Sequence, residues 1–226
     1  SRGGGPPVQI NGARGPLTAA QSKAVLNTLQ NGGPQTRIFD RHLRLEEEIA
    51  GSALRTGNDV VLLQDGPKTY RAMFESIKAA VDHINIETYI FDDDEVGQRF
   101  AKALVDKQSQ GVQVNLLRDS AGTFSTPAAF FDKMTAAGIQ VHEFNPINPL
   151  AARAQWQWNR RNHRKLLIVD GHTAFLGGIN ISSVYSSGSF RSGSRGWSMQ
   201  PGDDDPSRRP AALRLQGPVV CELQKL

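Results

Sequence analysis

The sequence of 226 residues has a single cysteine, Cys221, and no run approaching the roughly 18 apolar residues of a membrane-spanning helix. A lone cysteine excludes an internal disulfide framework and a zinc site built from cysteines. Residues 1–30 also lack the apolar core of a signal peptide. If the protein works at a membrane, we therefore expect these residues to touch it from outside.

Neither sign of charge dominates the composition. The 26 Lys and Arg residues and 22 Asp and Glu residues give a formal charge of +4, a mild excess compatible with anionic lipid, with nucleic acid or with neither. Hydrophobic residues make up 38% and charged residues 21%, which is ordinary for a globular protein. One α/β domain is the simplest interpretation.

Residues 1–36 are predicted to be a flexible N-terminal arm with a short helix. Residues 1–16 are rich in glycine and proline. Thr18 followed by Gln21 is typical of a capping box, and it opens a helix that runs to about Gln30. A second, amphipathic helix is expected at about residues 37–54.

From residue 59 onward, short β-rich runs alternate with helical stretches. The predicted strands are residues 60–63, 84–91, 112–117 and 139–144, and the predicted helices are residues 67–82, 93–109 and 127–137. Alternation of this kind, with short turns between the elements, predicts a mixed α/β fold in which helices pack on the faces of a sheet with parallel pairs.

A hairpin is predicted where Asp170 and Gly171 separate two apolar runs, because this dipeptide favours a two-residue type I′ turn. Val169 then pairs with His172. Extending this register places three further pairs opposite each other: Lys165 with Leu176, His163 with Gly178, and Arg161 with Asn180.

Side chains alternate between the faces of a strand, so this register puts His163, Lys165, Gly178 and Asn180 on one side of the sheet. Such a pocket suits an oxyanion, since Lys165 supplies positive charge, Asn180 donates a hydrogen bond and Gly178 leaves room for the ligand. A neutral imidazole at His163 can act as a nucleophile. Asp170 has the opposite parity, and its position in the turn predicts a structural role.

The spacing of His163, Lys165, Asp170, Gly177, Gly178 and Asn180 resembles the HKD signature of the phospholipase D superfamily. Residues 62–70, 86–97, 138–146 and 216–220 are similar to bacterial cardiolipin synthases, and the resemblance covers about residues 37–226. It implies an α/β/α sandwich whose mixed sheet is flanked by helices on both faces. Residues 37–226 would form one phospholipase D-like domain with one HKD motif, truncated before a second.

The resemblance also implies the chemistry. A phosphatidyltransferase of this kind uses no metal and no cofactor, and it forms a covalent phosphatidyl-histidine. It implies His163, Lys165 and Asp170 as catalytic residues and Lys165, Asn180 and Gly178 as ligands of the substrate phosphate. The expected substrate is a phosphatidylglycerol-like phospholipid at a bacterial membrane, to which the protein binds peripherally.

The sequence departs from the family pattern at three points. Gly178 replaces the serine common elsewhere in the superfamily. Residues 198–212 lack the usual acidic residue that supports the catalytic histidine, and Asp203, Asp204 and Asp205 are candidate substitutes. No second HKD motif is present, so we expect the chain to continue past Leu226, or a second copy to supply the acid.

Other interpretations stay open. A single-HKD phosphodiesterase could cleave nucleic acid as a homodimer, and a half-domain could be inactive. Four arginines near Trp156 and Trp158 could bind lipid headgroups or nucleic acid, or form a solvated loop: Arg153, Arg160, Arg161 and Arg164. Residues 92–95 are interpreted as the acidic first turn of a helix rather than a metal site. The remaining histidines are expected to be structural or exposed: His42, His83, His142 and His172.

Overall fold

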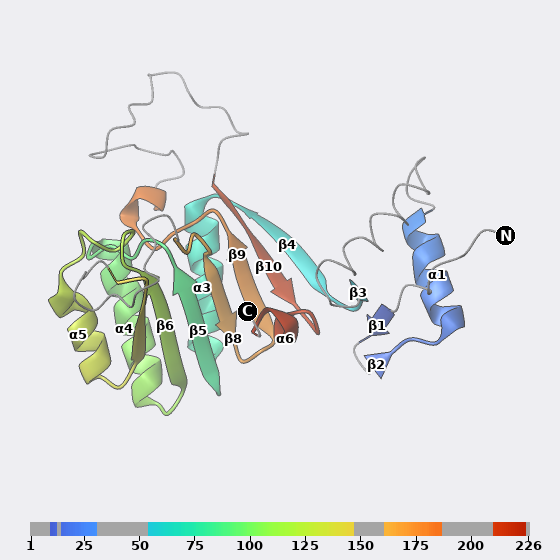
Figure 1. The fold of residues 1–226 in the computed structure, drawn as a ribbon, viewed down its shortest axis with the longest axis horizontal. Helices are drawn as coiled ribbons and strands as arrows, with labels where there is room; N and C mark the ends of the chain where they lie inside the picture. Colours follow the sequence, from blue (N-terminus) through green and yellow to red (C-terminus); the bar gives the residue numbers. More distant parts are fainter. Residues whose placement is uncertain (1–9, 13–14, 31–53, 147–160, 187–209, 225–226) are drawn as a thin grey trace, which may run out of the picture. The chain divides into compact units, whose positions relative to one another are not determined.

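The computed structural model describes residues 10–12, 15–30, 54–146, 161–186 and 210–224 (Figure 1). It divides into two compact units. The first comprises Ser1–Asp59 and Gly217–Leu226, and the second is Val60–Gln216.

The described part of the first unit contains a small sheet in the order β2-β1-β3 and two helices. Their bounds are β1 Ile10–Gly12, β2 Gly15–Pro16, α1 Ala19–Gln30, β3 Leu54–Arg55 and α6 Val220–Leu223. The predicted capping box is confirmed, because the Thr18 backbone N–H donates to Gln21 Oε1 at 3.0 Å and the Gln21 N–H donates to Thr18 Oγ1 at 3.3 Å. The predicted arm is not flexible throughout, since Ile10 lies in a strand and is fully buried. Most of the helix expected at residues 37–54 lies outside the described residues.

The second unit is built on a sheet whose described strands follow the order β4-β10-β9-β8-β5-β6-β7. Its strands are β4 Asp59–Gln64, β5 His83–Thr88, β6 Gln113–Asp119, β7 Gln140–Phe144, β8 Leu166–Val169, β9 Thr173–Gly177 and β10 Ala211–Gln216. Strands β5, β6 and β7 run parallel, whereas β8 is antiparallel to β5 and β9, and β9 is antiparallel to β10. The predicted mixed α/β fold with parallel pairs is therefore confirmed.

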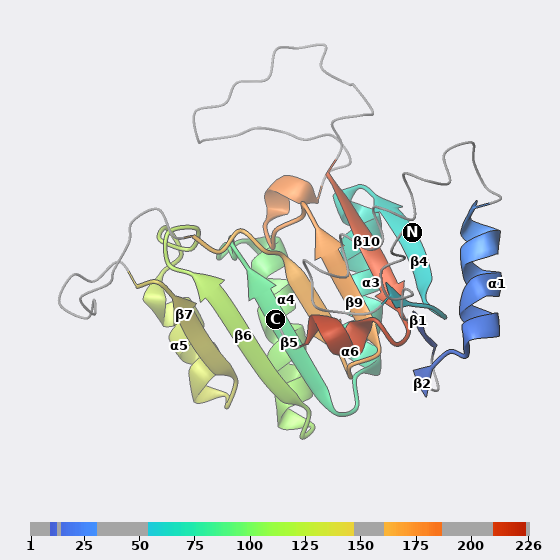
Figure 2. The same cartoon turned by 45° about the vertical axis from the view of Figure 1, so that its right-hand side comes forward.

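Three helices connect the parallel part of the sheet: α3 Gly66–Ala79, α4 Glu95–Ser109 and α5 Ala128–Ala136. Each connection steps across the sheet in the same direction, and right-handed crossovers then place all three helices on one face. Figures 1 and 2 show this arrangement from two directions. The predicted helices and strands of this region agree with the observed ones to within a few residues.

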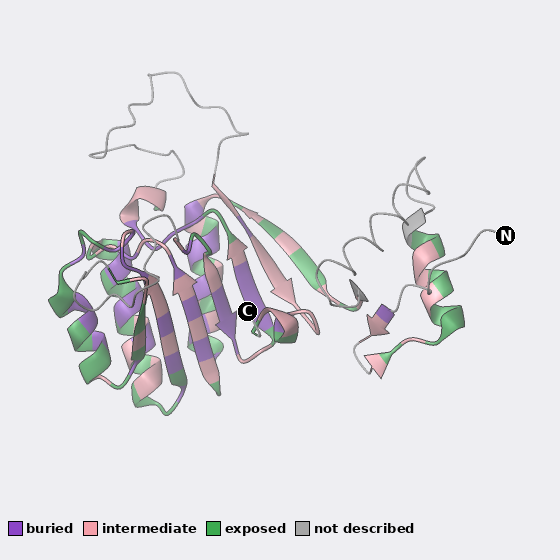
Figure 3. Ribbon diagram, viewed as in Figure 1, coloured by how far each residue is buried: buried purple, intermediate pink, exposed green. Residues whose placement is uncertain are grey.

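The main core lies between these helices and the sheet. Every second residue of β5 is buried, as Figure 3 shows by alternating colours along the strand. Ile84 and Ile86 face α3 and α4, whose buried side chains include Ile77, Phe100 and Leu104. This face is apolar, and it fixes which side chains of the neighbouring strands point away from the helices.

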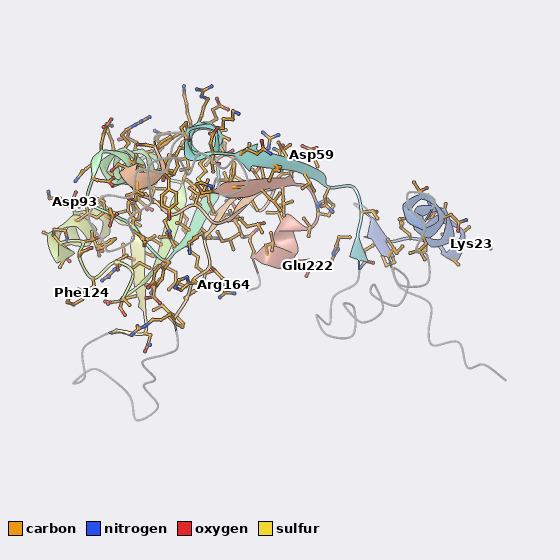
Figure 4. The ribbon with its side chains drawn as sticks, turned by 90° about the horizontal axis from the view of Figure 1, so that it is seen from above. Lys23, Asp59, Asp93, Phe124, Arg164 and Glu222 are labelled. Carbon is orange, nitrogen blue, oxygen red and sulfur yellow. The ribbon has the colours of Figure 1, made fainter. Side chains whose placement is uncertain are left out.

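The carboxyl ends of the three parallel strands meet at one edge of the sheet. Strand β8 is antiparallel to β5 and pairs Glu87 with Leu166, so the segment before β8 approaches the same edge. Strand β9 ends there, and the short 3-10 helix η1, Ser183–Tyr185, follows. Figure 4 looks onto this edge, with Arg164 labelled. Ligand sites of open α/β sheets lie at such carboxyl edges.

Candidate functional site

Two residues predicted from the sequence, His163 and Lys165, both contact the ring of Tyr89, just after the end of β5. The rings of His163 and Tyr89 stack with their centroids 3.9 Å apart and an interplanar angle of 28°. Lys165 Nζ lies 5.3 Å from the Tyr89 ring centroid and donates to the backbone oxygen of His163 at 2.6 Å. Partial burial lowers the pKa of the Lys165 ammonium. His163 is exposed, so its ring is accessible from this edge.

Tyr89 is held in place by the loop after β6. A Cβ atom on Gly122 would lie 1.9 Å from the backbone oxygen of Tyr89, so only glycine allows this approach. The loop itself is fixed by the buried carboxylate of Asp119, whose Oδ1 accepts from Ala121 N at 2.9 Å and Gly122 N at 3.3 Å. The platform under His163 is therefore set by the ends of two neighbouring parallel strands.

Two carboxylates fix the residues on either side of His163. Asp119 Oδ2 accepts from the backbone N–H of Asn162 at 2.8 Å. Glu87 Oε1 accepts from the Asn162 side chain and from Arg164 Nε, the latter at 3.1 Å. Because Asn162 and Arg164 are both tied to the sheet, the backbone of His163 between them has little freedom.

Asn180 reaches the same edge from the segment after β9. Its Oδ1 accepts from the backbone N–H of Ile90 at 3.2 Å, and its Nδ2 donates to the Tyr185 hydroxyl at 3.0 Å. The Tyr70 hydroxyl lies 2.7 Å from the Asn180 backbone oxygen and 2.8 Å from that of Ser182. Burial raises the pKa of Tyr70, so its hydroxyl stays protonated and can donate. A carboxamide is thus fixed next to residue 89, where the imidazole and ammonium lie.

The hairpin that follows contains the predicted turn but not the predicted pairing. Asp170 and Gly171 both have positive φ, at 51° and 62°, and His172 N donates to the backbone oxygen of Val169 at 3.1 Å. The strand partner of Val169 is nevertheless Thr173 rather than His172. One residue is therefore left over at the turn, as in a β-bulge, and it shifts the register by one.

This shift corrects three predicted pairs. Leu166 faces Leu176, so the following pairings are wrong: Lys165 with Leu176, His163 with Gly178, and Arg161 with Asn180. A slip of one residue would normally send the side chains to opposite faces. Here β8 begins at Leu166 and β9 ends at Gly177, so His163, Lys165 and Asn180 lie beyond the regular strands. Contacts with residues 89 and 90, rather than strand alternation, bring them together.

The two glycines after β9 have different physical roles. Gly177 has φ of 158°, and a Cβ atom there would lie 2.5 Å from the backbone oxygen of Ala211 in β10. Gly178 donates its N–H to that oxygen at 3.0 Å, and the nearest atom to a Cβ built on it is 3.8 Å away. Gly177 therefore permits the close approach of β10, whereas Gly178 borders open space.

A profile of the family described as "Cardiolipin synthase, PLD-like domain" matches residues 73–188, just over half of the chain. The chain belongs to this phospholipase D-like (PLD-like) family. Cardiolipin synthase of Geobacillus kaustophilus is 34% identical over 144 residues, covering 63% of this chain and 28% of the relative. Cardiolipin synthase A of Pseudomonas fluorescens is 35% identical over 147 residues, covering 63% and 29%. The chain thus spans less than a third of the length of these relatives.

A solved structure supports the same fold. The structure titled phosphatidylserine synthase from Haemophilus influenzae matches with a TM-score of 0.50 and 17% identity, covering 74% of this chain and 34% of that one. At this identity the match concerns the fold alone, and it agrees with the mixed sheet and its helices.

In this PLD-like chain, Asp170 of the HKD motif follows β8, whereas His163 precedes it, so the two residues lie at opposite ends of the strand. Asp170 accepts from the backbone N–H groups of Val81 at 3.0 Å, Asp82 at 2.9 Å and His83 at 3.0 Å. Burial alone would raise the pKa of Asp170, but these three donors and the nearby His83 outweigh it, and the net pKa is lowered. At about 3.3 Å per strand residue, Asp170 is roughly 15 Å from Lys165. These contacts support the structural role predicted from the position of Asp170 in the turn, while its grouping with the catalytic residues stays a prediction.

Only some of the other residues singled out from the sequence of this PLD-like chain lie in the part that the structure describes. Asp94 caps α4 by accepting from Gly97 N at 2.9 Å, and Glu95 lies in the first turn, so the helix interpretation of residues 92–95 is confirmed. Across the described ranges, no group of three or more His, Cys, Asp and Glu side chains could hold a metal ion. Several predicted candidates lie outside the described residues: His42, Arg153, Trp156, Trp158, Arg160, and Asp203 to Asp205.

Three residues of the site were not predicted from the sequence: Tyr89, Glu87 and Asp119. Tyr89 and Glu87 lie at the carboxyl end of a predicted strand, and Asp119 ends the next one. Polar or aromatic residues at the ends of adjacent parallel strands share one sheet edge, and this was the signal available to find them.

Proposed function

We propose that the chain supplies one half of the active site of a phosphatidyltransferase acting on phospholipid phosphodiesters, as a cardiolipin synthase does. The observation that carries this proposal is the convergence of His163, Lys165 and Asn180 at residues 89–90 of the sheet edge, within the segment that matches the family. In it, His163 is the nucleophile, and Lys165, Asn180 and Gly178 receive the phosphate.

The proposed reaction has two steps. An imidazole nitrogen of His163 attacks the phosphorus of a phospholipid, the bond from phosphorus to the leaving alcohol breaks, and an acid protonates that alcohol. An acceptor alcohol then loses a proton to the same group and attacks phosphorus, breaking the phosphorus to nitrogen bond and freeing His163. Lys165 neutralises the oxygens of phosphorus in both steps, while Nδ2 of Asn180 has a second N–H besides the one given to Tyr185.

The acid must come from a second histidine of the same kind, because one imidazole cannot attack and protonate at once. Residues 37–226 then form one HKD half. Its counterpart is a second half in the same chain or in a homodimer partner. Phosphatidylglycerol as both donor and acceptor would give cardiolipin and release glycerol.

Substrates of this class reside in a bilayer, so we propose peripheral association with a bacterial membrane. Among the described helices, none is both long and apolar enough to cross a membrane. The names of the cardiolipin synthase relatives support the same substrate class.

The test is conversion of radiolabelled phosphatidylglycerol to cardiolipin by the purified protein, with a quench in alkaline denaturant to trap labelled phosphohistidine, whose phosphorus–nitrogen bond is cleaved by acid. His163→Ala should abolish both signals. The matched control is His142→Ala, which removes an exposed imidazole from β7 and should leave both unchanged. Lack of transfer together with cleavage of DNA or RNA would replace this proposal by a nuclease, and lack of any turnover would favour an inactive half-domain.

A further inference from the structure

A groove lies between α3 and α4. Its volume is about 410 Å³. Its apolar lining comes from Pro67, Tyr70, Phe74 and Val96. Phe74 is half-buried, so the groove offers apolar surface at the outside of the helical layer. The reaction proposed above does not use this surface.

Three exposed cations line the same groove: Arg71 and Lys78 of α3, and Arg99 of α4. Within the part of the chain that the structure describes, none of the three has an ion-pair partner. By contrast, Lys102 on α4 pairs with Asp106 at 2.6 Å. Glu75 is the one acidic residue lining the groove. The groove is therefore apolar along its floor and positive along its rim.

The groove is connected to the candidate site through Tyr70. This residue lines the groove, and its hydroxyl lies 2.7 Å from the backbone oxygen of Asn180. Ser186, next to η1, also lines it. A molecule in the groove would thus contact Tyr70, which is hydrogen-bonded to a residue proposed to bind the phosphate.

We propose that this groove docks anionic phospholipids of the bilayer, with phosphate groups on the three cations and acyl carbon on the apolar floor. The proposal rests on the phosphatidyltransferase function, and it adds the surface by which the chain holds its substrate membrane. Both features are needed by an amphiphile with negative charge, because cations attract the headgroups and apolar surface retains the chains.

A single-stranded nucleic acid fits the groove less well. Bases bind by stacking on free aromatic faces. The ring of Phe74 already contacts Phe100, with centroids 4.3 Å apart, and the Arg99 guanidinium lies 5.0 Å from its centroid. The ring of Phe74 is therefore not a free stacking surface, although this half-buried residue still adds apolar area to the lining of the groove.

The experiment is flotation of the 226-residue chain with two kinds of vesicle, phosphatidylcholine alone and phosphatidylcholine mixed with phosphatidylglycerol. The chain should float only with the anionic vesicles. Arg71→Gln, Lys78→Gln and Arg99→Gln should each weaken binding about fivefold, the effect of one cation near an anionic surface. Circular dichroism checks that each variant is folded.

Two control variants remove the same charge elsewhere: Lys102→Gln on α4 and Lys133→Gln on α5, both exposed. They should bind as the wild type does. Equal losses in the controls would mean general attraction by net charge and would overturn the groove as the docking surface, as would unchanged binding in all three groove variants. Tighter binding of single-stranded DNA than of anionic vesicles, lost in the same three variants, would overturn the lipid assignment.

The readout separates this inference from the proposed function. His163→Ala should float as the wild type does, because docking does not need the nucleophile. Transfer of phosphatidyl groups in detergent micelles without groove-dependent flotation would leave the function standing and refute the docking surface. Groove-dependent flotation without any transfer would support the docking surface and refute the proposed function.

Discussion

Asp170 gives the sharpest test, because the HKD motif groups it with the catalytic residues whereas its contacts are structural. Its carboxylate accepts three backbone N–H groups from residues 81–83, where β5 begins. In Asp170→Asn, Oδ1 can keep its two bonds, but Nδ2 would face the N–H of Val81, donor against donor. Hydrogen bonds to charged groups contribute about 1.5 to 3 kcal/mol each. Val81 and Asp82 are exposed, so we expect a total loss of about 1 to 3 kcal/mol.

The pH dependence of this loss follows from the lowered pKa of Asp170. A carboxyl whose pKa is lower in the folded than in the unfolded chain stabilises the fold above the unfolded value of about 3.9. That contribution disappears as the pH falls through the folded pKa. Urea unfolding should therefore show a constant difference between wild type and Asp170→Asn from neutral pH down to about pH 5, and a shrinking difference below about pH 4.

Activity decides between the two roles of Asp170. If the carboxylate is structural, turnover per folded molecule of Asp170→Asn should equal that of the wild type at a temperature where both are folded. Asp82→Asn, on a neighbouring exposed carboxylate, controls for the charge removed. A turnover lowered by orders of magnitude with an unchanged free energy of unfolding would refute the structural role.

Three further predictions concern the site. Tyr70→Phe leaves the backbone oxygen of Asn180 without the tyrosine hydroxyl as a donor, and urea unfolding should show a free energy of unfolding lower by about 1 to 3 kcal/mol. An unchanged free energy of unfolding would contradict this role of the hydroxyl. Gly177→Ala drives a methyl group into β10 and should lower the free energy of unfolding by about 1 to 3 kcal/mol, whereas Gly178→Ala should be nearly neutral; equal effects would contradict the assignment. Tyr89→Leu removes the face on which His163 stacks and should lower turnover about 3- to 30-fold, while Tyr89→Phe keeps most of it; loss in both would point to the hydroxyl instead.

The fold could be predicted largely from local patterns. Every second side chain of β5 is buried and those between are half-buried, and the predicted helices at 67–82 and 93–109 have the spacing of amphipathic helices. The hairpin register could not be predicted in the same way. Asp170 and Gly171 specify a tight turn, but whether His172 pairs or bulges depends on the strands on both sides of it.

The sequence motif names three polar side chains of the candidate site but not the residues that hold them in place. Motif spacing identifies His163, Lys165 and Asn180 because these residues lie close together in the sequence, at characteristic separations. Tyr89 and Asp119 lie more than 40 residues before His163, and only the parallel pairing of β5 and β6 with the approach of β8 brings them to it. Contacts of this kind depend on strand order, which one sequence does not specify.

The position of His163 has a consequence for the proposed reaction. Among the described residues, its ring has Tyr89 on one face and is otherwise exposed at the sheet edge. A phosphatidyl group bound to an exposed imidazole would react with water, which is far more concentrated than any acceptor lipid. The proposed transfer therefore requires that this edge be covered while the acid is supplied, since a water-excluded site would both protect the intermediate and strengthen the attraction between Lys165 and a phosphate. The proposed transfer thus needs both a proton donor and the exclusion of water at the sheet edge that holds His163.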